Sequence, residues 1–436
     1  MVIFAHYRQF NDPRKRCEFC WLGVLDIDLG SAGVIGYQRE MSGSSPLRNP
    51  TFRRLFAAQA LALLGMGLTT VALALLVYEL DPARAGLVLG GALGLKMVVK
   101  VIVAPIAGAY ANRFSRRALL GAIDLFRAAL IALYPFIDAS WQVYVLVAVI
   151  AAAEGAFNPI FQATIPDVLK DEGQYTKALS YSRIAFDLEN VASPLLAALF
   201  LGFATFDLLF EVNAVAFLLS SVLLFAGRLP TPELEKLREL QPPFQKVTRG
   251  LRLYFRNREL RGVFTLYFAI ATGSAAAIVA TVLYVKEGLG LADTQVALAM
   301  TGFGAGSILA ALLLPRLLDQ IADLSVMLAG GAVVGAALLL SAGNPNFSLF
   351  IFFWALMGFG TALAMTPVGR VITRASDSTH RAELFAAQYG LSHCAWLVLY
   401  PLVGAFVGMF SFSVAFALLA FLALIATVIS YSIWRG

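Results

Sequence analysis

The sequence has little charge, histidine or cysteine. Charged residues make up 14% of its 436 residues and hydrophobic residues 59%, with three histidines and three cysteines. Soluble domains average about 25% charged residues, so this composition excludes an ordinary soluble domain. The GxxxxGK[ST], GxSxG and HExxH motifs are also absent. The sequence therefore predicts neither an ATPase nor another enzyme.

The few cysteines predict no metal site, cofactor or disulfide. Cys17 and Cys20 form a lone CxxC near His6, and Cys394 is isolated in the sequence. Zinc or redox chemistry would need two further ligands or a redox fold. Residues 1–47 lack helical periodicity. We expect them to be a cytoplasmic tail, either disordered or an artefact of an upstream start codon, and not a cleaved signal peptide.

Long uncharged segments dominate the rest of the chain. Examples are Leu55 to Val77, Gly262 to Val285 and Ser325 to Gly369. About 20 such residues cross the hydrocarbon core of a bilayer. The sequence therefore predicts an all-α integral membrane protein with twelve transmembrane helices. Their expected limits are about 54–78, 85–109, 117–137, 141–163, 177–203, 207–227, 261–285, 293–315, 324–342, 347–369, 383–408 and 411–433.

The chain also repeats itself weakly. The basic turn that follows Gly108 has a counterpart about 207 residues later, at Pro315-Arg316-Leu-Leu-Asp319-Gln320, and Asn49 corresponds to Asn257 at nearly the same offset. This repetition predicts two pseudo-symmetric six-helix bundles at residues 48–228 and 261–436. The expected connection, residues 229–260, is a charged cytoplasmic linker with an amphipathic helix that lies on the inner leaflet, unless the linker is simply solvated.

Basic residues are concentrated in alternate loops. They follow the predicted second, fourth and tenth helices and precede the first, whereas the opposite loops contain little beyond Arg84 and Lys286. The positive-inside rule therefore places both termini in the cytoplasm. This topology explains the formal net charge of +6 without any nucleic-acid partner. The expected location is a bacterial-type plasma (inner) membrane.

The turn between the second and third predicted helices resembles a signature of the major facilitator superfamily. Gly108, Arg113, Arg116 and Arg117 match the pattern, whereas Asn112 replaces its acid. The resemblance covers about residue 48 to the end and implies a transporter fold with an inner gate at this turn. In the family, the acid and the following arginine close the gate by pairing with neighbouring helix ends. Here the gate is expected to be weaker, or Asp319 in the second copy carries the role.

The stretch Asn158 to Leu169 resembles the efflux-type branch of the superfamily. The resemblance implies proton-coupled export of a small drug-like or siderophore-like solute by alternating access, by a monomer whose partners are membrane lipid, solute and protons. Two alternatives stay open: translocation of lipid or lysolipid between leaflets, and efflux of a divalent metal.

Polar residues in the predicted helices are the candidates for substrate binding and proton coupling. A charge at the bilayer centre costs about 2.5 to 3.5 kcal/mol, so such residues are expected to pair or to face water. Arg183 and Asp187 share a helix face, which makes Asp187 the expected brace and leaves two glutamates as the preferred coupling acids. The candidates are Lys96, Lys100, Glu154, Asp187, Glu189 and His393.

Glycines concentrate in two of the predicted helices. Gly86, Gly90, Gly91 and Gly94 lie in the second, and Gly302, Gly304 and Gly306 lie in the eighth. Small residues let the backbones of membrane helices approach closely. These glycines therefore predict either simple close packing or an interface that moves between the halves.

Overall fold

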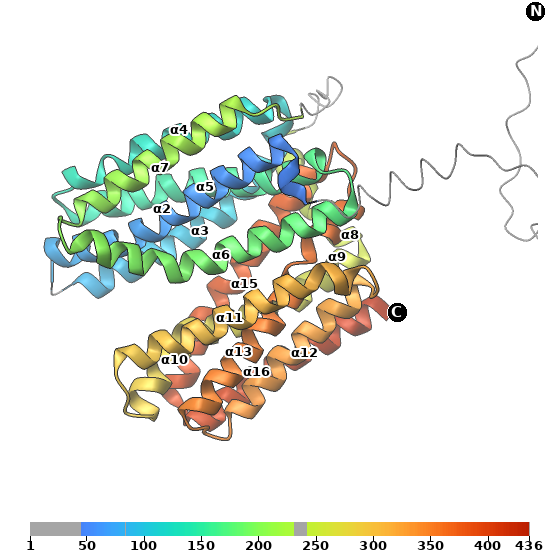
Figure 1. Cartoon of the computed structure of the whole chain (residues 1–436). Coiled ribbons are helices and arrows are strands. Elements are labelled where there is room, and N and C mark those ends of the chain that lie inside the picture. The colour runs from blue at the N-terminus through green and yellow to red at the C-terminus, as the bar shows by residue number, and fades with distance from the viewer. Residues whose placement is uncertain (1–44, 83, 231–241, 436) are drawn as a thin grey trace, which may run out of the picture. The chain divides into compact units, whose positions relative to one another are not determined.

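The computed structural model describes residues 45–82, 84–230 and 242–435. The predictions for residues 1–44, including the CxxC, lie outside this range. Every regular element in the described residues is a helix (Figure 1). The first half comprises η2 (Pro46–Arg48), α2 (Pro50–Leu80), α3 (Ala85–Tyr110), η3 (Ala111–Arg113), α4 (Arg116–Ile131), η4 (Tyr134–Phe136), α5 (Ser140–Val168), α6 (Glu172–Leu201) and α7 (Asp207–Ala226).

The linker helix α8 (Pro243–Arg256) separates this half from the second. The second half comprises α9 (Arg258–Ala275), η5 (Ala276–Ala280), α10 (Thr281–Leu283), η6 (Tyr284–Gly288), α11 (Asp293–Leu318), α12 (Asp323–Ser341), α13 (Phe347–Met365), α14 (Val368–Arg374), α15 (Arg381–Met409) and α16 (Phe412–Arg435).

Eleven helical stretches in the described residues are long and apolar enough to cross a membrane. They correspond to eleven of the twelve predicted spans. The twelfth predicted span, 177–203, corresponds to the 30-residue helix α6. The helical membrane architecture predicted from the sequence is thus confirmed.

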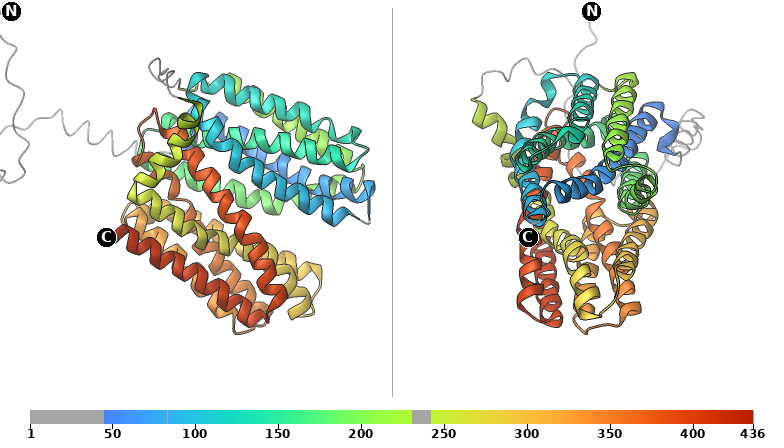
Figure 2. Two further views of the ribbon diagram at one scale, coloured as in Figure 1. Left: turned by 180° about the vertical axis from the view of Figure 1, so that it is seen from behind. Right: turned by 90° about the vertical axis from the view of Figure 1, so that its left-hand side faces the viewer.

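The two halves repeat the same helix pairings. In the first half α2 packs on α7, α3 on α5 and α4 on α7; in the second half α9 packs on α16, α11 on α13 and α12 on α16. The repeated asparagines have the same role, because Asn49 caps the N-terminus of α2 and Asn257 caps that of α9. Helix α15 contacts α3 and α5 of the first half as well as α9 (Figure 2).

Two predicted spans are less regular than the sequence indicates. The span predicted at 261–285 contains two π-helical turns, η5 and η6, within its α-helix. The span predicted at 347–369 ends its α-helix at Met365, and a separate helix, α14, begins at Val368. Pro367 explains this break, because proline lacks the amide hydrogen that a continuous helix would need.

Candidate functional site

Glu154 on α5 is the centre of a buried charge cluster in the first half. Its Oε2 lies 2.6 Å from the Nζ of Lys100, and its Oε1 lies 3.3 Å from the Nζ of Lys96. Arg127 on α4 approaches the same Oε1 at 3.9 Å. The Glu154 side chain is 1% exposed, whereas that of Lys96 is 24% exposed. Three cations therefore surround one carboxylate, and Lys96 is the most accessible of them.

A second carboxylate completes this cluster. Asp124 accepts a hydrogen bond from Arg127 Nη1 at 3.0 Å and another from the hydroxyl of Ser220 at 2.6 Å. Both Asp124 and Arg127 are buried. Sequence reasoning separated these residues from the site because Asp124 and Arg127 lie near the start of their helix. The i, i+3 spacing of the pair is the signal that places them on one helix face.

Asp187 on α6 joins the two halves. Arg183 binds its carboxylate through two nitrogens, Nη2 at 2.9 Å and Nε at 3.0 Å, as the i, i+4 spacing predicts. Ser307 of α11 donates a hydrogen bond to the same carboxylate at 2.5 Å. Arg183 also donates to the Ser307 hydroxyl at 2.9 Å. The Arg183–Asp187 pair thus lies within α6, and Ser307 connects it to α11.

Glu189 differs from the other membrane carboxylates. It is partly buried, and in the described part of the chain it makes neither a hydrogen bond nor an ion pair. Lys96 is the charged group with which it interacts electrostatically. A Cβ atom at Gly67 would lie 2.8 Å from Glu189 Oε1, so this side chain lies directly against the backbone of α2.

His393 lies on the second-half side of the same region. It is buried, and its Nδ1 lies 2.8 Å from the carbonyl oxygen of Tyr389. The hydroxyl of Tyr389 accepts a hydrogen bond from Asn158 Nδ2 at 3.2 Å, which connects α15 to α5. His393 also packs edge-on against Trp396, with ring centres 5.2 Å apart. The structure thus places His393 in a packed aromatic environment.

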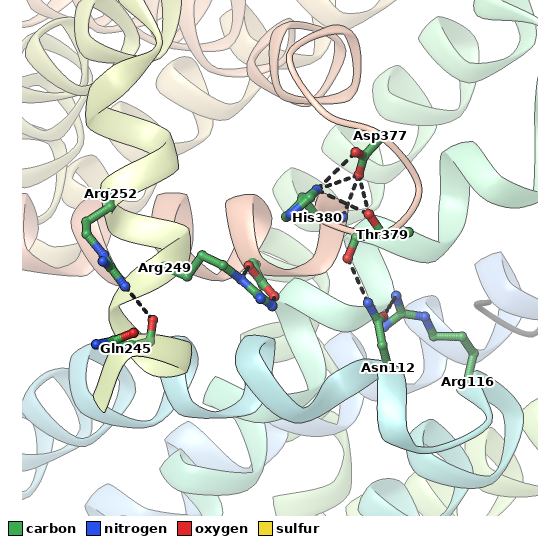
Figure 3. Close-up of polar contacts among 9 residues, drawn as sticks. Asn112, Arg116, Gln245, Arg249, Arg252, Asp377, Thr379 and His380 are labelled. Carbon is green, nitrogen blue, oxygen red and sulfur yellow. Dashed lines mark hydrogen bonds and ion pairs between the residues drawn. The ribbon is translucent and has the colours of Figure 1, made fainter. Parts of the chain in front are cut away.

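The predicted gate signature lies where the two halves meet. Asn112 donates to the carbonyl oxygen of Thr379 at 2.7 Å and accepts from Arg116 Nη2 at 3.0 Å (Figure 3). A Cβ atom at Gly108 would lie 2.4 Å from the Cβ of Ala386, so glycine permits the close contact of α3 with α15. Asn112 therefore connects the halves by hydrogen bonds in place of an ion pair.

Three other residues predicted to belong to the gate are exposed in the structure. Arg113 is exposed and lies over the ring of Tyr110 at 4.9 Å, and Arg117 is exposed. Asp319 is also exposed and makes no ion pair among the described residues, so it does not replace the missing acid. The sequence repeat located the equivalent helix end in the second half. It could not show that the Asp319 side chain is exposed there.

No motif in the sequence predicts the ion pairs that join the halves at this end. Arg381 of α15 pairs with Asp167 of α5. Arg370 lies 2.8 Å from a carboxylate oxygen of Glu172 and 3.2 Å from one of Asp323. The Arg381–Asp167 and Arg370–Glu172 pairs cross the halves and join residues about 200 positions apart, so neither helical spacing nor a local motif indicates them.

The linker helix α8 packs against the same interface. Arg249 donates to Glu383 Oε2 at 2.8 Å, and Figure 3 shows its side chain pointing toward α15. A Cβ atom at Gly250 would lie 2.6 Å from the Glu383 carbonyl oxygen. Tyr254 is fully buried and hydrogen-bonds to Gln388. The predicted amphipathic helix exists, and part of its apolar face contacts protein; its position on the leaflet stays a prediction.

We call the ends of the helices that adjoin α8 the linker end. The described hydrogen bonds and ion pairs between the halves all involve this end or the midsection of the helices, from Ser307 to Tyr389 in the second half. By contrast, Gly90 and Gly94 of α3 have open space where a side chain would begin. The described structure is therefore closed at the linker end.

A cavity of about 520 Å³ also opens at the linker end. It is not at the Glu154 cluster, and it is lined by residues of both halves. The charged residues of its lining are Asp167, Lys170, Glu172, Arg370, Arg374 and Arg381.

Comparisons with known proteins agree with this architecture. The chain is 25% identical over 363 residues to the uncharacterized MFS-type transporter YfiS of Bacillus subtilis, which covers 78% of this chain and 84% of that protein. It is 21% identical over 311 residues to macrolide efflux protein A of Streptococcus pyogenes, covering 69% and 75% of the two chains.

Solved structures with the same fold include the human organic anion transporter MFSD10, at a TM-score of 0.75 and 14% identity over 89% of this chain and 100% of that one. A bacterial homologue of the iron transporter ferroportin, in an outward-facing state, has a TM-score of 0.73 at 15% identity over 88% and 98%. The family profile of the Major Facilitator Superfamily matches residues 55–271 and 263–435. The chain is therefore an integral membrane transporter of the Major Facilitator Superfamily and not an enzyme.

Proposed function

We propose that this transporter exports a small solute in exchange for protons, and that Glu189 is the carboxylate that binds the proton. The observation that carries the proposal is the lack of a hydrogen-bond or ion-pair partner for Glu189 in the described residues. Among the four membrane carboxylates described above, Glu189 can bind and release a proton without breaking an ion pair. Lys96 lies close enough to sense the change of charge.

The other carboxylates fit structural roles better. Three cations surround Glu154, and protonating it would leave all three without that counter-charge. Asp187 is fixed by Arg183 and Ser307. These contacts favour Glu189 over Glu154, although the sequence made both glutamates candidates. They also support Asp187 as the brace.

We infer that the linker end faces the cytoplasm, because the basic loops lie there. The described conformation is then open to the outside. A reporter that fluoresces only in the cytoplasm, fused after Gly436, should be bright in cells. A dark reporter with normal protein levels would contradict the orientation.

In the proposed cycle, Glu189 takes up a proton from the outside after the solute has left. The halves then exchange contacts, the linker end opens, and the proton leaves to the cytoplasm before the next solute binds. Moving one charge across 100 mV supplies about 2.3 kcal/mol, which is enough to drive accumulation about fiftyfold. In each cycle, α8 must move away from α3 or α15, and the hydrogen bond between Asn112 and Thr379 must break.

The similarity to macrolide efflux protein A supports a drug-like solute. The remaining alternatives have less support from the geometry. In the residues described, no group of three or more histidine, cysteine or acidic side chains could hold a metal ion. No contact in the described residues favours a lipid over a soluble solute.

The test compares Glu189→Gln with Glu211→Gln, a matched control on an exposed residue of α7. Purified protein is reconstituted in vesicles with a pH-sensitive dye inside. A panel of macrolides and other amphipathic drugs is then screened for drug-driven proton movement by the native protein. We expect Glu189→Gln to abolish proton movement while drug exchange down its own gradient continues.

Two results would contradict the proposal. Normal drug-driven proton movement by Glu189→Gln would exclude this residue as the coupling acid. Drug transport by the native protein that is unaffected by collapsing the proton gradient would exclude proton coupling altogether. The Glu211→Gln control should behave as the native protein in both assays.

A further inference from the structure

Arg116 and Arg381 share a single carboxylate at the linker end. Arg381 pairs with Asp167, and Arg116 interacts electrostatically with both of them. Arg116 is 1% exposed, yet it makes no ion pair among the described residues. Its guanidinium group donates a hydrogen bond to Asn112, but the Asn112 side chain is neutral and does not balance the charge. Two arginines and one carboxylate leave an excess positive charge where the halves meet.

The same cluster contains hydrogen-bond donors without acceptors. The Nε and Nη1 atoms of Arg116 and the Nε atom of Arg381 are buried and have no hydrogen-bond partner in the described chain. A buried donor left unpaired costs about 1 to 3 kcal/mol, and more when it is charged. The geometry is therefore unfavourable unless an acceptor with negative charge completes it.

The cavity at the linker end gives such an acceptor access to Arg381 and Asp167, and the buried Arg116, which does not line the cavity, interacts electrostatically with both. Asp167 and Arg381 line it, and so do Lys170, Arg370 and Arg374. Arg370 and Arg374 are balanced by Glu172 and Asp323, with which they form ion pairs. Lys170 interacts with Asp167 but brings a further positive charge. The lining and the buried Arg116 together carry two positive charges more than these partners neutralise.

We propose that this cavity binds a phosphate group, which accepts hydrogen bonds from the Arg381 guanidinium group and is attracted by the positive charge of the buried Arg116 beside it. Guanidinium donors match the geometry of phosphate oxygens, and an ion of this charge neutralises the excess on the cluster. The phosphate group belongs either to the headgroup of an anionic lipid or to a free phosphate. In both cases the chemistry of recognition is the same.

The position of the site gives it an effect on transport. Arg116 belongs to α4 of the first half, and Arg381 belongs to α15 of the second half. A bound phosphate therefore bridges the halves and stabilises the conformation that is closed at the linker end. When the halves separate there, the two arginines separate as well. This regulation does not depend on which solute is carried or on which acid binds the proton.

The test measures the closed conformation directly. Spin labels are attached at two exposed positions of the linker end, Arg113→Cys and Arg435→Cys, in a protein whose three native cysteines are replaced by alanine. Double electron–electron resonance gives the ratio of closed to open molecules in detergent. Inorganic phosphate at about ten times its Kd should raise this ratio about tenfold if it binds only the closed form. Sodium chloride at equal ionic strength is the control for screening.

A lipid arm identifies the source of the phosphate group. The labelled protein is placed in nanodiscs of phosphatidylglycerol or of phosphatidylcholine. A rise with phosphatidylglycerol alone assigns the site to a lipid headgroup, and a rise with inorganic phosphate in detergent shows that a free phosphate suffices. If neither ligand changes the ratio more than its control does, the site does not exist.

Matched variants locate the effect. Arg116→Gln should remove the response, whereas Arg117→Gln, the same charge change on the exposed neighbour, should keep it. Asn112→Asp places a carboxylate beside Arg116, so it should also remove most of the response even if Arg116→Gln fails to fold. A full response in either Arg116→Gln or Asn112→Asp would overturn the proposal.

Discussion

The two halves share a pattern of helix pairing but differ in what fills their centres. In the first half, cationic side chains of α3 and α4 converge on Glu154 of α5. In the second half, hydroxyl and aromatic groups occupy the corresponding interior: Trp354 donates to the hydroxyl of Thr281 at 2.6 Å, and Tyr284 donates to the carbonyl of Pro345 at 2.8 Å. The same architecture is thus held by ion pairs in one half and by aromatic packing in the other.

This difference separates two tasks. The charged centre adjoins the proposed coupling acid, because Lys96 interacts electrostatically with both Glu154 and Glu189. The centre built from aromatic rings and hydroxyl groups can support irregular helices. The two π-helical turns, η5 and η6, lie in the second half, next to the buried Tyr284. The proposed coupling acid, Glu189, therefore lies in the half whose centre is charged.

The largest expected effect comes from breaking the charged centre. Glu154→Gln keeps the shape of the side chain but leaves Lys96, Lys100 and Arg127 without this counter-charge. Removing one partner of a buried pair costs about 3 to 5 kcal/mol, so the variant should be purified in low yield and should unfold at a clearly lower temperature in detergent.

The control for this prediction is Glu211→Gln, the same chemical change at an exposed position. Its unfolding temperature should match that of the native protein. If Glu154→Gln is as stable as the control, the cluster is hydrated or otherwise compensated, and the contrast between the two centres loses its energetic basis.

The next effect tests the packing of the second half. A Cβ atom at Gly306 of α11 would lie 1.8 Å from the carbonyl oxygen of Ala355 on α13. Gly306→Ala should therefore force the helices apart and lower the free energy of unfolding by about 1 to 3 kcal/mol. Gly304 has nothing within 4 Å of such an atom, so Gly304→Ala is the matched control and should not destabilise the protein.

Thermal unfolding of both glycine variants in detergent measures the difference. Equal unfolding temperatures for Gly306→Ala and Gly304→Ala would mean that α11 and α13 can separate at little cost. The second half would then be softer than the close contacts indicate. The result also sorts the glycines that the sequence grouped together, since Gly90 and Gly94 resemble Gly304 in having open space.

Sequence reasoning found the elements whose physical causes are local. Hydrophobic runs predicted the membrane helices, and the repeat aligned Asn49 with Asn257, which the structure shows to be equivalent helix caps. The pairing of Arg183 with Asp187 followed from an i, i+4 spacing. Each of these features depends on residues within a few positions of one another, so the chain itself carries the information.

The features that sequence reasoning missed depend on contacts between distant segments. The gate at the linker end pairs Arg381 with Asp167, and α8 reaches Glu383 through Arg249. Which arginines are buried also depends on packing: Arg116 is enclosed, whereas Arg113 and Arg117 in the same motif are exposed. A motif fixes the residue types but not the direction in which each side chain points.

The smallest expected effect concerns Asp377, in the loop between α14 and α15 that receives the hydrogen bond from Asn112. Partial burial acts to raise the pKa of Asp377, but hydrogen bonds from Thr379 and His380 outweigh burial and lower this pKa to about 2. A lowered folded-state pKa contributes stability that is complete above the ordinary value of 3.8 and is lost as the pH falls through about 2.

Hydrogen-exchange protection of the His380 amide, which donates to Asp377 at 2.8 Å, should therefore be constant from pH 7 to about pH 4. Asp377→Asn should reduce that protection by only about two- to fivefold, because the group is largely exposed. His380→Gln, which removes the neighbouring imidazole, is the control. Protection that falls between pH 7 and about pH 4 in both the native protein and His380→Gln would show that this loop is not held by the ionised Asp377.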